Sequence, residues 1–433
     1  MAPLVSLTPR EAGGRTRGML EVKFMRKVDS VVGNAVCTAL AVGKRLTKPF
    51  QREPAKIRKV CVMKFFGMGS IVVASPSLRA LRDAYPDAEL HFVTFKQNKE
   101  LLEILGLTDK HHFIDNTTPQ AFLASTLKVA RDLRREAVDL VVDLEFYAKF
   151  PLILASLGAV PKKAGFYLTG EPWRRTLLDV PGWYNHYYHT KDIFLSLVYL
   201  LAKDDFYYTD FEQFSAKYKY PKIEPSDREI NAVRKKLADH GVPASSKIFV
   251  LNPNTSPDLA PEARKWPMER YGELCRQLLA EHPDAHIAFI GTKGEREYVE
   301  RVMRTAKDAR CINLAGELNL RELIALFSMT NLFVSNDSGP MHLACLTDTP
   351  VVGLFFADTP TLFAPLATNA ASVAPKLYSI PLFTVYNGKD VVVGKPTDVI
   401  TNIPARTVTV KQVMENVQRV LGETSRVSAR IAN

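Results

Sequence analysis

The sequence predicts an α/β protein built from two doubly wound parallel sheets, and three observations support this. Short apolar runs alternate with helical patterns along the chain, as strands and helices alternate in such sheets. The apolar runs are continuous, which is typical of strands buried on both faces. Polar turns that contain glycine follow several of these runs. A length of 433 residues is enough for two or three units with full cores.

The first unit is expected over residues 58–225. Its strands are predicted at 58–66, 89–95 and 138–144, and its helices at 70–84, 97–105 and 120–136. The stretch 165–220 is rich in Tyr, Trp and His, with glycine and proline between them. This stretch is either a packed aromatic insertion or a binding wall for a bulky amphipathic ligand.

The second unit is expected over residues 226–433, after a Lys- and Pro-rich linker at 218–226. Helices are predicted at 227–240, 267–281, 294–306 and 321–328, and strands at 248–251 and 285–290. A strand, a turn, a short helix and a second strand follow at 331–356. Two successive units of similar size suggest a ligand that is held across the cleft between them.

The net charge of +11 belongs mainly to an N-terminal extension, expected over residues 1–57. Residues 1–60 hold 13 Lys and Arg against 4 Asp and Glu, and the other 373 residues hold 44 against 42. The nearly neutral body argues against a nucleic-acid partner, because such proteins carry their charge around the site. Five scattered cysteines without a CxxC pair argue for a reducing compartment and against a zinc site or disulfide framework.

Apolar residues recur at helical spacing between 20 and 46, and Lys and Arg flank them. The longest uncharged run, 30–43, is about half of what a membrane-spanning helix needs. No cleavage site of a secretory signal is evident. Two interpretations stay open: a basic amphipathic helix on an anionic membrane surface, or a helix packed on the body with solvated charges.

The most informative segment is the turn SNDSGPMH at 335–342, between an apolar strand and a short helix. Its glycine lets the backbone approach a ligand, and the helix start offers unpaired N–H groups. This combination suits a phosphate or diphosphate, although the turn alone is also compatible with an ordinary capped strand-to-helix connection. Two further loops follow strands of the same unit. Candidate ligands of an anionic nucleotide in these three loops are Asn254, Thr255, Ser256, Arg264, Lys265, Gly291, Glu295, Asp337, Ser338, Gly339, Met341 and His342.

The chain resembles the ADP-heptose:lipopolysaccharide heptosyltransferase family of inverting glycosyltransferases, which have the GT-B fold of two facing Rossmann-like domains. The donor-domain turn DSGPMH of this family stands at 337–342, and its basic WP motif at 264–267. Its G-x-x-x-E loop matches 291–295, and its N-terminal glycine turn with P-x-L-x-A-L matches 67–81. The resemblance spans roughly residues 58–365.

The resemblance places a catalytic Asp directly after the glycine of the first turn, and here that position is Ser70. A serine hydroxyl is not a general base near neutral pH without help. Asp143 and Glu145 end the strand beside the expected acceptor cleft, and Glu145 is the predicted replacement for the base. Glu145 is also compatible with a solvated or helix-capping role.

The resemblance implies a glycosyltransferase that moves a sugar, with heptose as the expected one, from a nucleotide-diphosphate sugar such as ADP-heptose to a lipopolysaccharide-type or other glycolipid or oligosaccharide acceptor. Arg264, Lys265 and the N–H groups after Asp337 would stabilise the leaving diphosphate, so neither a metal nor a cofactor is expected. The expected location is the cytoplasm, on the inner face of the membrane. Alternatives are a catalytically weakened nucleotide-sugar-binding protein on the same fold, favoured by Ser70, and a different GT-B enzyme.

Overall fold

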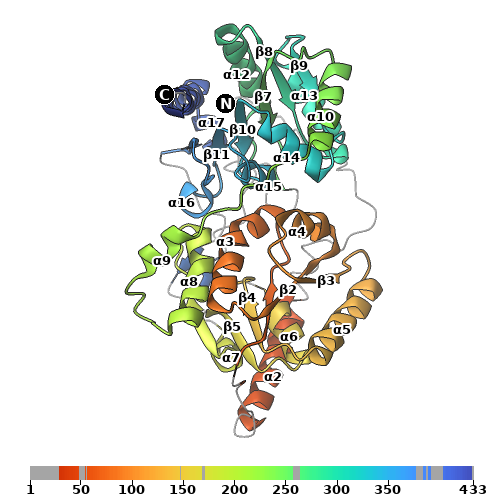
Figure 1. Ribbon diagram of the computed structural model, residues 1–433, viewed down its shortest axis with the longest axis vertical. Helices are drawn as coiled ribbons and strands as arrows, with labels where there is room; N and C mark the ends of the chain where they lie inside the picture. Colours follow the sequence, from red (N-terminus) through yellow and green to blue (C-terminus); the bar gives the residue numbers. More distant parts are fainter. Residues whose placement is uncertain are drawn as a thin grey trace, which may run out of the picture.

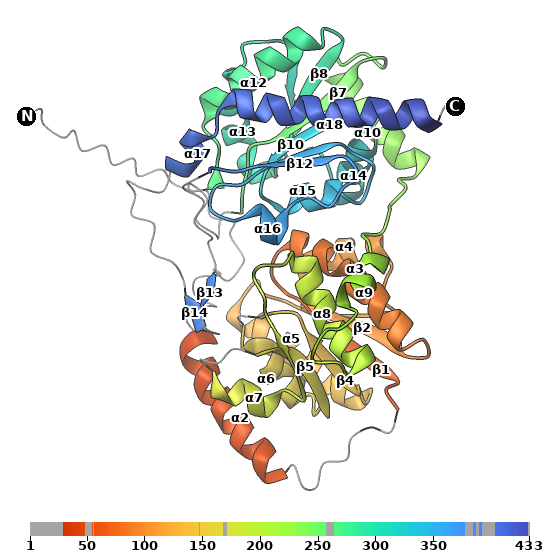
Figure 2. The same ribbon diagram turned by 90° about the vertical axis from the view of Figure 1, so that its left-hand side faces the viewer.

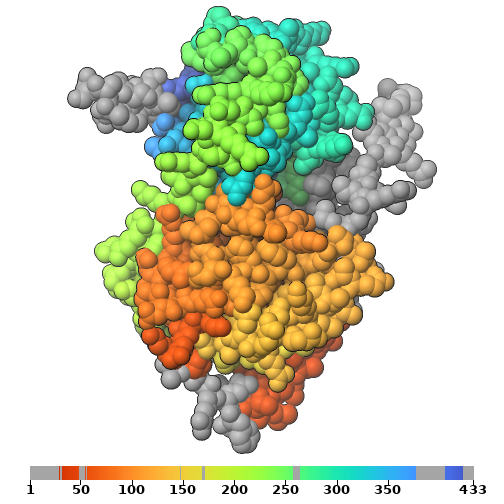
Figure 3. Space-filling model, turned by 45° about the vertical axis from the view of Figure 1, so that its right-hand side comes forward, coloured from red at the N-terminus to blue at the C-terminus, as the bar shows by residue number. Residues whose placement is uncertain are grey.

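The computed structural model describes residues 29–47, 54, 56–146, 148–167, 171–256, 264–376, 384–386, 389–391 and 403–431. Two lobes are stacked along the long axis of the molecule, each with its own sheet and covering helices (Figure 1). Most of the predicted N-terminal extension, residues 1–28, 48–53 and 55, lies outside the described residues. The surface narrows to a waist where the two lobes meet (Figure 3).

The first lobe is built on a six-stranded parallel sheet in the order β3-β2-β1-β4-β5-β6. This is the strand order of a dinucleotide-binding Rossmann sheet. Its strands are β1 (Lys59–Met63), β2 (Glu89–Phe95), β3 (Lys110–Ile114), β4 (Leu140–Asp143), β5 (Lys162–Tyr167) and β6 (Val180–Trp183). Its helices are α3 (Met68–Ala84), α4 (Lys99–Leu105), α5 (Pro119–Arg135), α6 (Phe150–Leu157), α7 (Pro172–Leu177), α8 (Thr190–Lys203) and α9 (Phe211–Lys217).

The second lobe repeats this topology with a six-stranded parallel sheet in the order β12-β11-β10-β7-β8-β9. Its strands are β7 (Lys247–Asn252), β8 (Ala285–Phe289), β9 (Cys311–Asn313), β10 (Leu332–Asn336), β11 (Val351–Leu354) and β12 (Ala370–Val373). Its helices are α10 (Asp227–Asp239), α12 (Met268–Glu281), α13 (Arg296–Arg304), α14 (Leu320–Ser328), α15 (Gly339–Ala344), α16 (Pro360–Phe363), α17 (Ile403–Thr407) and α18 (Val410–Ile431). The helix α18 runs across this lobe and contacts β11 and β12 (Figure 2). A small antiparallel pair, β13 (Thr384–Tyr386) and β14 (Lys389–Val391), lies apart from both sheets.

The predicted α/β fold with two doubly wound parallel sheets is confirmed, and one expectation is corrected. The aromatic stretch 165–220 is not an insertion, because it supplies the end of β5, the edge strand β6 and the helices α8 and α9. Helix α8 packs on α3 and β6, and every residue from Ile193 to Leu200 is buried. The aromatic residues of this stretch are therefore divided between the core of the first lobe and its surface.

The helix α2 (Asn34–Thr47) packs against α6 and α7 of the first lobe. Its buried residues, Cys37 and Ala41, contact Leu152, Trp173 and Leu177. Lys44 donates to the backbone oxygen of Leu177 at 2.9 Å and pairs with Asp179 at 2.6 Å. Of the two interpretations of the extension, packing on the body is confirmed for this segment. None of the helices in the described part of the chain has the length and apolar character of a transmembrane segment.

Candidate active site

The strand order of each sheet reverses at one point, between β1 and β4 in the first lobe and between β7 and β10 in the second. Ligands of such sheets bind outside the carboxyl ends of the strands at this point. Residues 67–70, here called the first glycine turn, follow β1, and Asp143 and Glu145 stand at the end of β4. Residues 337–342, the second glycine turn, follow β10, and residues 252–256 follow β7. The predicted site residues in these segments therefore lie at the two reversal points, whereas Gly291 and Glu295 follow the neighbouring strand β8.

The first glycine turn begins at Gly67, whose φ of 80° lies in the left-handed region that favours glycine. Helix α3 starts at the next residue, so Ser70 is half-buried in the first turn of this helix. The position at which the family resemblance implies a carboxylate therefore presents a hydroxyl at a helix start.

Glu145 is buried, and one of its oxygens holds the two chain segments of the first reversal point together. Its Oε1 accepts from Lys64 Nζ at 2.7 Å and from the backbone N–H groups of Phe65 at 2.6 Å and Phe66 at 2.7 Å. These contacts anchor the segment after β4 to the segment after β1. Glu145 thus has a structural task at the reversal point, and its role as the base stays a prediction.

Asp143 lies beneath Glu145 and is fully buried at the end of β4. Its Oδ1 accepts from the backbone N–H of Glu145 at 2.8 Å. Burial, with a smaller contribution from the negative charge of Glu145, raises the pKa of Asp143 to about 8, so the carboxyl group is mostly protonated at neutral pH. This geometry supports a role in positioning Glu145, and the direct catalytic role of Asp143 also stays a prediction.

Arg264 connects the second glycine turn to the loop after β7. Its Nη2 donates to the backbone oxygen of Asp337 at 2.7 Å and to the Asp337 carboxylate at 2.8 Å. Burial alone would lower the pKa of Arg264, but the attraction of Asp337 and Asp358 together raises it. Lys265, by contrast, lies over the ring of Tyr298 at 4.3 Å. The side chains of Arg264 and Lys265, although adjacent in sequence, therefore contact different residues.

A polar network joins the loop after β7 to the second glycine turn. Asn252 Nδ2 donates to Ser335 Oγ at 3.1 Å and to Ser338 Oγ at 2.8 Å, and Asn254 Nδ2 donates to the backbone oxygen of Ile290 at 2.9 Å. A Cβ at Gly291 would lie 2.6 Å from Asn254 Nδ2, so only glycine allows this approach. Thr255 is buried here, and Ser256 is half-buried.

The side chains of two predicted ligands, Glu295 and Met341, already make contacts within the protein. Glu295 Oε2 accepts from the backbone N–H of Thr292 at 2.7 Å and from its hydroxyl at 2.8 Å, which forms a capping box. Met341 is fully buried, and its Sδ would lie 2.7 Å from a Cβ at Gly353. Met341 therefore packs in the core through its side chain.

Several buried polar atoms around the second reversal point have no hydrogen-bond partner in the part of the chain that the structure describes. They are Asn254 Oδ1, His342 Nδ1, and the Nε and Nη1 atoms of Arg264. Buried polar atoms without a partner are rare, and each one calls for an explanation. Burial lowers the pKa of His342 to about 4, so its imidazole is neutral at physiological pH. A polar ligand at this point would satisfy both donors and acceptors.

The two glycine turns meet in the interface between the lobes, where α3 contacts α15. A Cβ at Gly69 would lie 2.8 Å from His342 Cδ2 and 3.1 Å from Gly339 Cα. Nearby, His189 of the first lobe contacts the backbone oxygen of Ala364 in the second lobe at 3.0 Å. The reversal points of the two sheets are thus brought together across one interface.

Sequence reasoning missed two features of this interface. Asp358, buried a few residues after β11, is close enough to raise the pKa values of both Arg264 in its own lobe and Tyr184 in the first lobe, and so lies near the interface. Tyr184 stacks on Phe146 with ring centroids 3.5 Å apart and an angle of 4° between the rings. The position of Asp358 at a strand end was a usable signal, whereas the stacking of two aromatic residues 38 positions apart was not.

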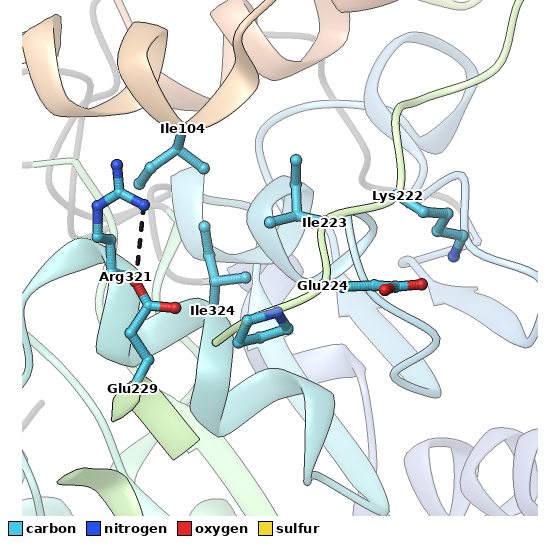
Figure 4. A pocket seen from close by; sticks show the side chains of 8 residues that line it. Ile104, Lys222, Ile223, Glu224, Glu229, Arg321 and Ile324 are labelled. Atoms are coloured by element: carbon cyan, nitrogen blue, oxygen red, sulfur yellow. Dashed lines mark ion pairs between the residues drawn. The ribbon is translucent and has the colours of Figure 1, made fainter. Parts of the chain in front are cut away.

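A separate groove of about 250 Å³ lies beside the linker between the lobes. Ile104 of the first lobe and Ile324 of the second face it, and Arg321 pairs with Glu229 at 3.6 Å on its rim (Figure 4). The linker is bound to the second lobe here, because Ile223 N–H donates to the backbone oxygen of Leu346 at 2.8 Å. This groove marks the hinge side of the interface and does not include the glycine turns.

Comparison with known proteins gives one family. The sequence model of glycosyltransferase family 9 (heptosyltransferase) matches residues 126–385. The chain is 26% identical over 313 residues to the lipopolysaccharide core heptosyltransferase OpsX of Haemophilus influenzae, covering 71% of this chain and 82% of the relative. It is 23% identical over 308 residues to lipopolysaccharide heptosyltransferase 3 of Escherichia coli, covering 70% of this chain and 83% of that protein.

Solved structures agree on the fold. The ADP-heptose lipopolysaccharide heptosyltransferase II of E. coli superposes with a TM-score of 0.64 at 18% identity, over 85% of this chain and 99% of that chain. A glycosyltransferase family 9 protein of Veillonella parvula superposes with a TM-score of 0.66 at 18% identity, over 86% of this chain and 99% of that chain. The two-domain GT-B architecture expected from the sequence is therefore confirmed.

Proposed function

Because the chain belongs to glycosyltransferase family 9, the heptosyltransferase family, we propose that it transfers a heptose from ADP-heptose to a lipopolysaccharide-type acceptor with inversion. The observation that carries this proposal is the set of buried polar atoms beside the second glycine turn that have no partner among the described residues. Arg264 offers N–H donors for a diphosphate, and Asn254 Oδ1 offers an acceptor for a hydroxyl. The nucleotide sugar is the ligand that supplies both kinds of partner.

In the proposed reaction, an acceptor hydroxyl attacks the anomeric carbon of the donor. The new bond joins the acceptor oxygen to that carbon, the bond from the carbon to the diphosphate oxygen breaks, and ADP leaves. The proton of the hydroxyl passes to the base, for which Glu145 is the proposed residue. Arg264, Lys265 and the N–H groups of the second glycine turn stabilise the negative charge of the leaving diphosphate without a metal.

The test is an assay of ADP release from purified full-length protein with ADP-heptose, with and without a heptose-deficient lipopolysaccharide acceptor. Acceptor-dependent ADP release supports the proposal. UDP-glucose and GDP-mannose serve as donor controls and should give no release. Tight binding of ADP-heptose with no acceptor-dependent release from a panel of core acceptors favours the alternative that Ser70 suggests, a nucleotide-sugar-binding protein.

We further propose that the protein acts at the cytoplasmic face of the inner membrane, which its N-terminal helix contacts. Packing on the body leaves an apolar stripe exposed, formed at helical spacing by Val32, just before α2, and by Ala35, Ala39, Val42 and Leu46 of α2. Leu46 is 72% exposed and Val42 is 54% exposed. The surplus of positive charge in residues 1–60 favours an anionic lipid surface as the partner of this stripe.

The membrane proposal is tested by sedimentation with vesicles that contain phosphatidylglycerol. The double variant Val42→Asp/Leu46→Asp should lose vesicle binding, and added salt should weaken the binding of the wild type. The matched control is Leu123→Asp/Leu127→Asp on α5, where both leucines are also exposed. Equal sedimentation of the α2 variant and the control would exclude the stripe as the contact.

A further inference from the structure

A cluster of metal-binding side chains lies in the first lobe, at the amino-terminal half of its sheet. His91 is the third residue of β2, His112 is the third residue of β3, and Glu136 follows α5 directly. His91 and His112 are buried, and the side chain of Glu136 is 11% exposed. Because the glycine turns follow the carboxyl ends of strands, this cluster is separate from the candidate active site.

The ligand atoms of these residues converge on one point. His91 Nδ1 lies 3.1 Å from His112 Nε2 and 3.6 Å from Glu136 Oε2, and all three atoms are within 4.8 Å of one another. Ligands that bind zinc tetrahedrally at their usual bond lengths are roughly 3.3 Å apart. The separations of 3.1 and 3.6 Å are close to this value, and an ion would replace the hydrogen bond that now joins the two imidazoles.

A second carboxylate lies behind His91. Glu89 Oε2 is 3.2 Å from His91 Nε2, the ring nitrogen that faces away from the cluster. If this carboxylate accepts from Nε2, it keeps the proton there and leaves the lone pair of Nδ1 for an ion. Glu89 would therefore act as a positioning residue for the ligand His91.

A lysine side chain already pairs with the carboxylate of this cluster. Lys110 Nζ lies 2.8 Å from Glu136 Oε2 and competes for the carboxylate. Its side chain is 44% exposed on an edge strand, so it can turn into solvent.

We propose that His91, His112 and Glu136 form a binding site for a divalent transition metal of the zinc class. Two imidazoles and one carboxylate favour zinc over magnesium or calcium, which prefer oxygen ligands. A water molecule would complete the coordination. The ion would join the edge strand β3 to β2 and to the end of α5, and so stabilise the outer edge of the first lobe.

The test uses full-length protein that has been stripped of metal with a chelator. Isothermal titration with zinc chloride should give one ion per chain, and zinc should raise the melting temperature. His112→Ala and Glu136→Gln should abolish both effects, and Glu89→Gln should weaken binding roughly 10- to 100-fold. Lys110→Met should strengthen binding, because it removes the competing cation.

The matched control is His111→Ala. His111 is the neighbour of His112 on β3, and its Nε2 contacts the hydroxyl of Thr108 at 3.0 Å. This variant should bind zinc as the wild type does. If a ligand variant does not fold, X-ray absorption spectroscopy of the zinc-loaded wild type tests the proposal instead. The coordination shell of the zinc must then contain two imidazoles. Absence of stoichiometric zinc binding, or zinc binding that survives His112→Ala, would overturn the proposal.

Discussion

At the scale of single residues, Arg264 and Lys265 are adjacent cations with different expected contributions to donor binding. Arg264→Ala should weaken ADP binding by about 1.5–3 kcal/mol, the range for a hydrogen bond to a charged group. Lys265→Ala should have a smaller effect, because Lys265 lies over Tyr298. Titration calorimetry with ADP checks both variants and their combination. Arg310→Ala, which removes an ion pair with Asp308 elsewhere in the second lobe, is the control. Wild-type affinity in the double variant would refute the assignment of this pair to the diphosphate.

Glu145 is the residue whose role most needs a direct measurement. As the base, Glu145→Gln should lower turnover by about 10²–10⁴ while ADP affinity stays unchanged. The change also removes the carboxylate partner of Lys64. Glu322→Gln therefore serves as the control, because Glu322 pairs with Lys236 at the same distance of 2.7 Å. Ser70→Asp should change wild-type turnover little. Turnover that survives both Glu145→Gln and Asp143→Asn would show that the base lies elsewhere, with Asp358 as the next residue to replace.

The sequence predicted the positions of the loops better than the contacts of their side chains. Loops that follow strands are recognisable from the chain alone, and three of them follow β1, β7 and β10 at the reversal points of the two sheets. What a side chain contacts after the chain folds is not local information. Glu145 binds backbone groups about 80 positions earlier, and Glu295 is occupied by a capping box. The local sequence of a carboxylate at a strand end is therefore the same for a residue that stabilises the fold and for a residue that contacts a substrate.

At the scale of elements, Asp29, the first residue that the structure describes, caps the N-terminus of helix α6. The carboxylate of Asp29 accepts from the backbone N–H groups of Lys149 and Phe150, each at 3.0 Å from Oδ1, and Lys149 itself provides no side-chain cap. Asp29→Ala should lower the free energy of unfolding by about 1 kcal/mol, as the loss of a helix cap does. Urea unfolding followed by circular dichroism measures this. Asp87→Ala, at an exposed ion pair with Lys56, should change stability much less. Equal losses in the two variants would contradict the capping role.

The strands that the sequence predicted are the central ones, and the strands that it missed are mainly edges. β3, β6, β9 and β12 each end a sheet, and none of them was predicted. An edge strand is covered on fewer sides, so it needs no continuous apolar run. β3 begins Lys-His-His, β6 contains a proline and a glycine, and β9 has three residues. β5, which starts with two lysines, was missed for the same lack of an apolar pattern.

At the scale of the whole molecule, the close contact of the two glycine turns predicts that turnover depends on how closely the two lobes approach each other. A Cβ at Gly69 would lie 3.1 Å from the backbone at Gly339 and 2.8 Å from the His342 ring, so Gly69→Ala should push the lobes apart. Turnover should fall at least tenfold while ADP affinity changes little, because the donor ligands all belong to the second lobe. Gly43→Ala on α2, where no atom lies within 4 Å of the added Cβ, is the control. Unchanged turnover in Gly69→Ala would mean that the lobes do not close through these turns.

The packing of α2 also has a consequence for the timing of biosynthesis. Asp29 binds Lys149, 120 positions later, and the amide of Asn34 binds the indole of Trp173, 139 positions later. At typical rates of translation, these partners leave the ribosome on the order of ten seconds after the helix does. For that period the face around Cys37 is uncovered, together with the stripe that ends at Leu46. A nascent chain near the bilayer can therefore meet lipid through both faces of α2 before the lobe that later covers one of them exists.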